Sequence, residues 1–358
     1  MKIVIHPGMH KTGSSAIQDH FFKTAYPGLR YARWNSGNHS AMFVLLFQEP
    51  ELLAEYHGFK PRGPEFYARL PQMREDWRAS LTEDLTRAQA AGETLVFSAE
   101  DISGPQFHGA VGRMAAFFRE WSEDITVLAY ARRPLSYATS AFQERLKGGT
   151  VETLEAEKLW PFYKARFARL DEVFGRERVI LKPYDREHLS GGDVVRDFAT
   201  TIGVEMATAP ASEANTSLSA ESTALLFAQR RLGKGFVTGF DKAQAANRAF
   251  IDALRGIGSS KLTFSDSLWG SVLEKNRADL DWIEDRLGMP LRDTPTPNAI
   301  AIAISGEEDL FRLAEENQPA LETALLSTLH RDQRPALDRT VSTLELLRRL
   351  SYDPYSSL

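Results

Sequence analysis

The fold of this chain follows from its first loop and the residues around it, which read His6-Pro-Gly-Met-His-Lys-Thr-Gly-Ser-Ser-Ala-Ile-Gln18. A short β-branched run, Lys2–His6, comes before the loop, and a segment with helical apolar spacing begins near Ser14. A short apolar run of this kind fits a buried strand of a parallel sheet. The sequence therefore predicts a strand, a glycine-containing loop and a helix in direct succession.

The loop has the composition of an anion-binding site. Gly13 lets bare backbone approach a ligand closely, and the N–H groups at a helix start attract anions together with the helix dipole. Lys11 adds a full positive charge, while Ser14 and Ser15 add hydroxyl donors. The alternative is a simple turn and helix cap, in which Gly and Ser are also common. The order strand, loop, helix favours anion binding.

The loop departs from the P-loop that binds nucleoside triphosphates. That motif reads G-x-x-x-x-G-K-[ST]. Gly8 and Gly13 have the required separation, but Ser14 occupies the lysine position. The lysine stands at position 11 instead, inside the loop, which predicts a phosphate-binding loop with a different chemistry.

Further apolar runs at wide intervals predict the rest of a sheet. Helical spacing fills the stretches between them, as expected of crossover connections that cover a parallel sheet on both faces. The predicted strands are Thr94–Ser98, Ile125–Ala131 and Arg178–Lys182, and the predicted helices of this part are Ser14–Thr24, Phe66–Ala90, Ala110–Trp121 and Leu135–Leu146.

After about Gly203 the pattern becomes helical, with few strand signals. The stretch 201–215 is rich in Ala, Thr and Pro and suits a boundary or long connection. We therefore expect an α/β core over residues 1–205 and a helical region over residues 206–358 that packs on it. The helices predicted there are Ser217–Arg230, Lys242–Leu254, Asp266–Leu287, Glu307–Glu316 and Ala336–Leu350.

The composition of the 358 residues excludes several classes of protein. Hydrophobic residues make up 43%, which suits a chain that buries a full core, and the longest apolar run, Ala41–Phe47, is too short to cross a bilayer. The absence of cysteine excludes a disulfide scaffold and thiolate chemistry. The net charge of −5 gives no sign of nucleic-acid binding. We expect a soluble protein of the cytosol, without a leader or a transmembrane segment.

A second anion motif follows the third predicted strand. The sequence Arg132-Arg-Pro134 leads into a helix that contains Ser140, and proline suits the first turn of a helix because its missing N–H has no partner there. Arg132 can fork onto phosphate oxygens, and Ser140 can donate from the second helical turn. The alternative is a solvated basic helix in which Arg132 forms a structural ion pair.

These two motifs resemble those of the sulfotransferases that use 3′-phosphoadenosine 5′-phosphosulfate (PAPS), and bacterial members of that superfamily most of all. The 5′-phosphosulfate loop of that family has a Lys-[Ser/Thr]-Gly-[Ser/Thr]-[Ser/Thr] core, which residues 11–15 match. Its 3′-phosphate motif places a serine eight residues after an arginine, as Ser140 follows Arg132. The resemblance covers about residues 1–205 and implies a three-layer α/β fold with a parallel sheet of the P-loop NTPase-like type.

The resemblance also implies an activity. A sulfuryl group would pass from PAPS to a hydroxyl or amine of a carbohydrate, lipid or small metabolite, releasing adenosine 3′,5′-bisphosphate without a metal. Lys11 would be catalytic, and the helical region would help to define the acceptor. The sequence gives neither the acceptor nor the oligomeric state. The residues that would bind PAPS are His10, Lys11, Thr12, Gly13, Ser14, Ser15, Arg132 and Ser140.

A base for the acceptor is predicted after the second strand. Ligands bind beyond the carboxyl ends of parallel strands, and this strand ends in Ser98-Ala-Glu100-Asp101. Some carbohydrate-modifying members of the superfamily use a glutamate, and the Ser-x-Glu pattern resembles bacterial members, so Glu100 is the first candidate. Asp101 and His108 are the alternatives. Glu100 could instead cap a helix or act as a passive counter-ion of Lys11.

The sequence leaves two other functions open. A P-loop kinase or nucleotidase that uses ATP and Mg²⁺ would place Asp101 on the metal, although Ser14 stands where that motif has its lysine. A non-catalytic module would keep the nucleotide fold to hold a glycan or a partner protein.

Overall fold

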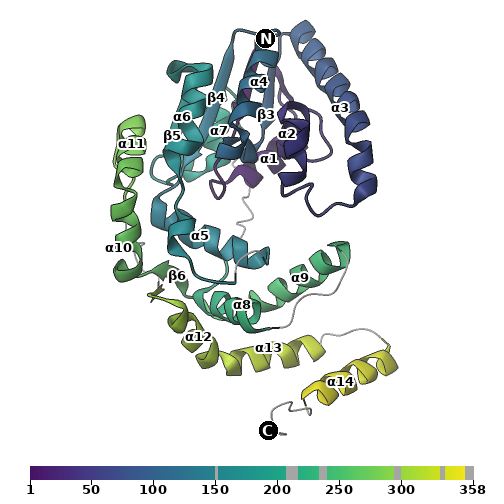
Figure 1. Cartoon of the computed structure of the whole chain (residues 1–358), viewed down its shortest axis with the longest axis vertical. Helices are drawn as coiled ribbons and strands as arrows, with labels where there is room; N and C mark the ends of the chain where they lie inside the picture. Colours follow the sequence, from purple (N-terminus) through teal and green to yellow (C-terminus); the bar gives the residue numbers. More distant parts are fainter. Residues whose placement is uncertain (150–151, 207–216, 234–239, 294–299, 331–334, 351–358) are drawn as a thin grey trace. The chain divides into compact units, whose positions relative to one another are not determined.

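The computed structural model contains a five-stranded parallel sheet with the strand order β2-β3-β1-β4-β5 (Figure 1). Because β1 pairs with β3 on one side and with β4 on the other, the loop after β1 starts at the centre of the carboxyl edge. The strands are β1 (Lys2–His6), β2 (Leu29–Tyr31), β3 (Thr94–Ser98), β4 (Ile125–Ala131) and β5 (Val179–Pro183).

The structure describes residues 1–149, 152–206, 217–233, 240–293, 300–330 and 335–350. The chain divides into two compact units, and it passes between them several times rather than once near residue 205. Most of the predicted connection 201–215 lies outside the described residues, and the functional division expected there stays a prediction. The first unit comprises Met1–Phe142, Glu155–Thr216 and Asp266–Thr296, and the second comprises Gln143–Leu154, Ser217–Ser265 and Pro297–Leu358.

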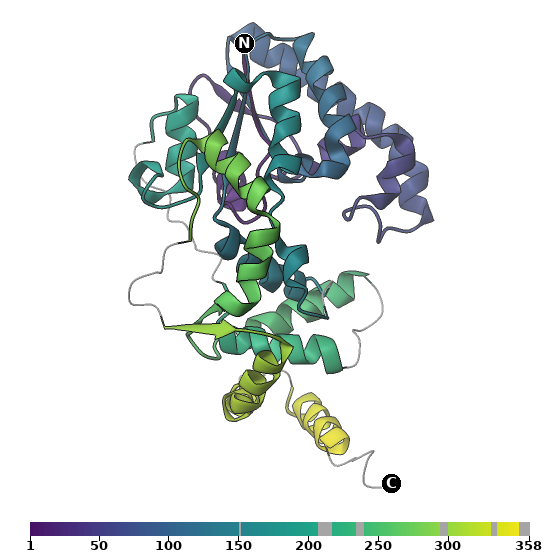
Figure 2. The ribbon, with the colours of Figure 1, turned by 60° about the vertical axis from the view of Figure 1, so that its left-hand side comes forward.

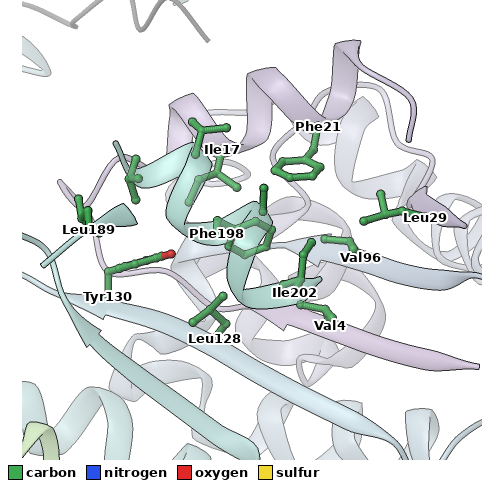
Figure 3. Packing of buried hydrophobic residues seen from close by; sticks show 13 residues of the cluster. Val4, Ile17, Phe21, Leu29, Val96, Leu128, Tyr130, Leu189, Phe198 and Ile202 are labelled. Carbon is green, nitrogen blue, oxygen red and sulfur yellow. The ribbon is translucent and has the colours of Figure 1, made fainter. Parts of the chain in front are cut away.

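One face of the sheet is covered by α1 (Ser14–Lys23) and α7 (Val194–Ile202) (Figure 3). Alternate residues of a strand point to opposite faces, so Val4 of β1 faces this layer and joins Phe198 in one fully buried cluster. Phe21 of α1 packs edge-on against Phe198, with ring centroids 5.3 Å apart. This packing fixes the position of α1, and therefore the end of the first loop, relative to the sheet.

The other face is covered by α2 (Ser40–Phe47), α4 (His108–Arg119) and α6 (Tyr163–Phe174). Phe97 of β3 lies against Phe43 and Phe118, with ring centroids 5.5 and 5.1 Å apart. The long helix α3 (Pro64–Ala91) also packs against α2 and β3. A parallel sheet with helices on both faces confirms the predicted layered α/β architecture.

The segment after residue 265 returns to the first unit. The predicted single helix over Asp266–Leu287 is two helices, α10 (Asp266–Lys275) and α11 (Arg277–Leu287), because Asn276 departs from helical backbone angles. Figures 1 and 2 show α11 beside α6. Arg286 of α11 donates two hydrogen bonds of 2.9 Å to Asp171 of α6. This part of the chain therefore belongs to the α/β layers.

The second unit is mainly helical, as expected, but it also contains a two-stranded parallel sheet that the sequence analysis missed. In the first unit, β5 begins at Val179 rather than Arg178 because Arg176–Arg178 forms a 3₁₀ turn. None of the described helices is both long and apolar enough to span a membrane. The elements of the second unit are α8 (Ala220–Leu232), α9 (Phe240–Leu254), β6 (Lys261–Phe264), β7 (Ala301–Ile304), α12 (Glu307–Glu316), α13 (Gln318–His330) and α14 (Ala336–Leu350).

Two histidines are fully buried beside the sheet. Burial lowers the pKa of His6 to about 3, and its Nδ1 lies 2.8 Å from the Ser98 hydroxyl. Burial also lowers the pKa of His39 to about 4. Its hydrogen bonds to the backbone of Ala32 and Ser98 act in the opposite direction but are the smaller effect. The His39 ring accepts from the N–H of Ser98 at one nitrogen and donates to the carbonyl of Ala32 at the other. Both rings are therefore neutral in the folded protein.

We predict that the protein loses stability when the pH falls from 7 to 5. Unfolded histidine binds a proton near pH 6.5, whereas the folded chain holds both rings neutral until about pH 4, so acidification favours the unfolded state. The expected loss at pH 5 is roughly 2 kcal/mol for each histidine. Urea unfolding at both pH values measures it. His39→Gln should weaken the pH dependence, the exposed His57→Gln should not, and a wild-type stability that is equal at pH 7 and pH 5 contradicts the prediction.

Candidate functional site

The first loop takes a tightly turned course between β1 and α1. Gly8, Lys11 and Gly13 all have left-handed backbone angles, with φ of 54°, 68° and 76°. For Lys11 this conformation costs about 1 kcal/mol or more. Thr12 holds the turn, because its hydroxyl and its N–H both donate to the carbonyl of Met9, at 2.6 and 3.3 Å. Both the hydroxyl and the N–H of Thr12, a residue predicted to bind the nucleotide, are thus engaged within the loop.

The loop is packed closely on both sides. A Cβ atom at Gly13 would lie 2.7 Å from Val194 Cγ1 at the start of α7. A Cβ atom at Gly8 would lie 2.8 Å from the Cβ of Glu100 and 2.9 Å from the Ser14 hydroxyl. Glycine at these positions lets the loop lie directly between α7 and the end of β3.

Arg132, which follows β4, joins the two motifs predicted to bind anions. Its guanidinium donates to the carbonyl of Lys11 over 2.7 Å and to the Ser136 hydroxyl over 2.9 Å. It also lies over the ring of Tyr184, 5.7 Å from the centroid. Burial lowers the pKa of Arg132 below its ordinary value, while Tyr184, Asp293 and two further tyrosines act to raise it. Lys11 and Arg132 therefore share one site within the first unit.

The helix that follows Arg132 supplies one of its hydrogen-bond partners. This helix, α5 (Pro134–Lys147), places Ser136 and not Ser140 against the guanidinium. Ser140 lies one turn further along α5 and is partly exposed. The role of Ser140 as a phosphate-binding residue therefore stays a prediction, and Ser136 is a contact that the sequence analysis did not name.

Asp293 caps the start of α5 and was not expected from the sequence. Its carboxylate accepts hydrogen bonds from the N–H groups of Leu135 and Ser136, at 2.9 and 3.1 Å. Burial raises the pKa of Asp293, while these two bonds and the charges of Arg133 and Arg132 act to lower it. The Asp293 carboxylate already accepts hydrogen bonds from the N–H groups at the start of α5. An anionic ligand at this helix end would therefore have to be bound by side chains.

Ser14 supplies a hydroxyl that points to a ligand. The residue is 2% exposed at the start of α1, and its oxygen makes no hydrogen bond of ordinary geometry to any described residue. It lies close enough to the Glu100 carboxyl to act toward lowering the pKa of that group. A buried hydroxyl without a partner costs about 1–3 kcal/mol. An anion in the loop would satisfy it, whereas the neighbouring Ser15 is exposed.

Glu100 starts the 3₁₀ segment η2 (Glu100–Ser103) directly after β3. Its carboxyl accepts a hydrogen bond of 3.2 Å from the Asn38 side chain. Burial raises the pKa of Glu100 and the Asp101 carboxylate adds to this, while the charges of His10 and Lys11 oppose it. A half-buried carboxyl of raised pKa beside the loop that contains Lys11 has the properties of a general base.

The other two base candidates are held in different ways. Asp101 accepts from His10 Nε2 over 2.9 Å and from the Tyr56 hydroxyl over 2.8 Å. His108 lies against α6, with Nε2 2.7 Å from the carbonyl of Ala165. The structure thus brings Glu100 and Asp101 to the first loop and places His108 among backbone partners.

The residues that the structure describes contain no group of three His, Asp or Glu side chains that could hold a metal ion. Asp101, the residue that a magnesium-dependent kinase would use, has both carboxylate oxygens engaged by His10 and Tyr56. The site is built from cations, backbone N–H groups and hydroxyls around two carboxyls.

Comparison with known proteins adds one distant similarity. No protein-family model and no curated protein matches the sequence. Among solved structures, the chain is similar to a sulfotransferase from Alicyclobacillus acidocaldarius, with a TM-score of 0.37 and 18% sequence identity, over 64% of this chain and 92% of that chain. A similarity at this level does not establish a shared activity. Any function has to follow from the chemistry of the site.

We predict that Gly13→Ala destabilises the protein more than Gly92→Ala. Both glycines have left-handed backbone angles, but the Cβ at Gly92 would meet nothing within 4 Å, whereas the Cβ at Gly13 would clash with Val194. In both variants the left-handed backbone angle lowers the free energy of unfolding by about 1 kcal/mol. At Gly13 the clash with Val194 lowers it by about 1–3 kcal/mol more. Urea unfolding compares the two variants, and Val194→Ala should restore part of the loss. Equal destabilisation of the two variants would show that the loop does not lie against α7.

Proposed function

We propose that this protein is a PAPS-dependent sulfotransferase, which moves a sulfuryl group to a hydroxyl or amine of an acceptor. The observation that carries the proposal is the hydrogen bond from Arg132 to the carbonyl of Lys11, because it unites the two anion motifs in one site. A nucleotide with a 3′-phosphate and a 5′-phosphosulfate needs two such groups of donors side by side. The buried hydroxyl of Ser14 supports a ligand at the same place.

The two ends of the nucleotide would be held by different elements. Arg132 and Ser140 would bind the 3′-phosphate through their side chains. The loop between β1 and α1 would bind the 5′-phosphosulfate through its cations, its hydroxyls and the N–H groups at the start of the helix. The residues of that loop are His10, Lys11, Thr12, Gly13, Ser14 and Ser15.

The chain's own residues would promote the transfer through charge and position. When bound, PAPS supplies the activated sulfuryl group. Glu100 would take the proton from the acceptor's hydroxyl or amine while the acceptor oxygen or nitrogen forms its bond to sulfur. Lys11 and the N–H groups at the start of α1 would stabilise the negative charge that develops on the departing bridging oxygen. The proposed reaction uses no metal ion. We also propose that the protein works in the cytosol.

We predict that adenosine 3′,5′-bisphosphate raises the melting temperature of the protein. A ligand at one hundred times its dissociation constant stabilises the folded state by about 2.7 kcal/mol. Adenosine 5′-monophosphate, which lacks the 3′-phosphate, should stabilise it less, and Arg132→Ala should remove the difference between the two ligands. Stabilisation by ATP with Mg²⁺ but not by the bisphosphate would favour a kinase instead.

We predict that Lys11→Ala slows the release of adenosine 3′,5′-bisphosphate from PAPS by about 10²–10³-fold, the effect of losing one transition-state donor. Lys23→Ala is the matched control, because Lys23 is exposed and paired with Asp19 at the far end of the same helix. The measurement is the rate of bisphosphate release at saturating PAPS. A Lys11→Ala protein that works at the wild-type rate excludes the proposed role.

A further inference from the structure

The guanidinium of Arg132 is a half-buried cation with neutral partners. It donates to the carbonyl of Lys11 and to the hydroxyl of Ser136, and it lies over the ring of Tyr184. In the part of the chain that the structure describes, no carboxylate forms an ion pair with it. Because a charge that is taken partly out of water is stabilised by an opposite charge, this cation is free to pair with an anionic ligand.

The carboxylate of Asp293 is a half-buried anion close to this cation. Its two oxygens accept from the N–H groups of Leu135 and Ser136, at 2.9 and 3.1 Å. The hydroxyl of the same Ser136 accepts from Arg132 Nε over 2.9 Å. Two opposite charges are thus linked through one residue, yet among the described residues they do not pair with each other.

The start of α5 keeps these two charges apart. The N–H groups of Leu135 and Ser136 hold the carboxylate at the helix end, while the Ser136 hydroxyl and the Lys11 carbonyl hold the guanidinium. Without a ligand, the charge of Asp293 partly offsets that of Arg132. A phosphate bound to the guanidinium would bring about two further negative charges next to Asp293, and like charges repel.

We propose that Asp293 is a fixed countercharge, which weakens the binding of the nucleotide 3′-phosphate at Arg132 and thereby promotes release of adenosine 3′,5′-bisphosphate. This inference rests on the proposed function. The 3′-phosphate takes no part in the transfer, so the product keeps it and would leave slowly from a site that contained cations alone. Changes in affinity at one site appear mostly in the dissociation rate, and product release limits the turnover of many enzymes.

Calorimetric titration of Asp293→Asn tests the countercharge. The substitution removes the charge and keeps the size of the side chain and one accepting oxygen. The variant should bind adenosine 3′,5′-bisphosphate about five- to tenfold more tightly than the wild type at low salt, and the difference should shrink as salt is added. Adenosine 5′-monophosphate, which lacks the 3′-phosphate, should bind to both proteins equally. A purely structural role of Asp293 predicts no gain for either ligand.

Asp279 provides the matched control, because it caps α6 in the same way. Its carboxylate accepts from the N–H groups of Tyr163 and Lys164, at 2.9 and 2.8 Å. Asp279→Asn and Asp293→Asn should both lower the melting temperature, but Asp279→Asn should leave the affinity for the bisphosphate unchanged. Asp293→Ser is a second neutral variant whose side chain suits a helix start, and it takes the place of the asparagine variant if that protein does not fold.

The dissociation rate of the bisphosphate, measured by stopped flow, should fall about fivefold in Asp293→Asn. Equal or weaker binding of the bisphosphate by the folded Asp293 variant overturns the countercharge and leaves the proposed function standing. A similar gain in Asp279→Asn, or for adenosine 5′-monophosphate, also overturns it, since the effect would then not be specific to the 3′-phosphate. Failure of the bisphosphate to bind to the wild type and to the variants overturns the proposed function, and the countercharge with it.

Discussion

The hydrogen bond from the Arg132 guanidinium to the carbonyl of Lys11 is the contact on which the site depends. It exists because β1 and β4 are neighbours in a parallel sheet, so their carboxyl ends meet at one edge. The left-handed backbone at Lys11 turns that carbonyl within reach of the arginine. Two segments more than a hundred residues apart thereby meet in one site.

The order of the three central strands places the candidate site residues in a row. Arg132 follows β4, the anion loop follows β1, and Glu100 follows β3, and these strands lie side by side in the order β4, β1, β3. Arg132, the loop with Lys11, and Glu100 therefore all lie at the same edge of the sheet, with the loop in the middle. The proposed transfer would use this order, with Lys11 stabilising charge on the leaving group and Glu100 acting as the base for the acceptor.

Much of this arrangement was predictable because its signals are local. Four short apolar runs identified four of the five strands of the main sheet, and the glycines with Lys11 identified the loop. The three-residue strand β2 and the pair β6 and β7 are too short to give a periodic signal. The break between α10 and α11 depends on the single residue Asn276, which no pattern marks.

The parts of the site that could not be predicted are contacts between distant segments. Asp293 caps α5 from the far end of the first unit, and Asp101 takes its partners from the first loop and from Tyr56. Only the packed layers bring such residues together. The contact between Arg132 and Ser136 in the first turn of α5 is another that the sequence analysis did not name.

We propose that one bis-phosphorylated adenosine binds both to the loop between β1 and α1 and to the motif that contains Arg132. Calorimetric titration with fragments that each carry one end of this ligand is the strongest test. Titrating wild type, Lys11→Ala and Arg132→Ala with adenosine 3′-monophosphate and adenosine 5′-phosphosulfate separates the two ends of the ligand. We expect Arg132→Ala to lose affinity mainly for the 3′-phosphate fragment and Lys11→Ala to lose affinity mainly for the phosphosulfate fragment. Equal losses for both fragments in both variants, or no binding of either fragment to the wild type, would contradict it.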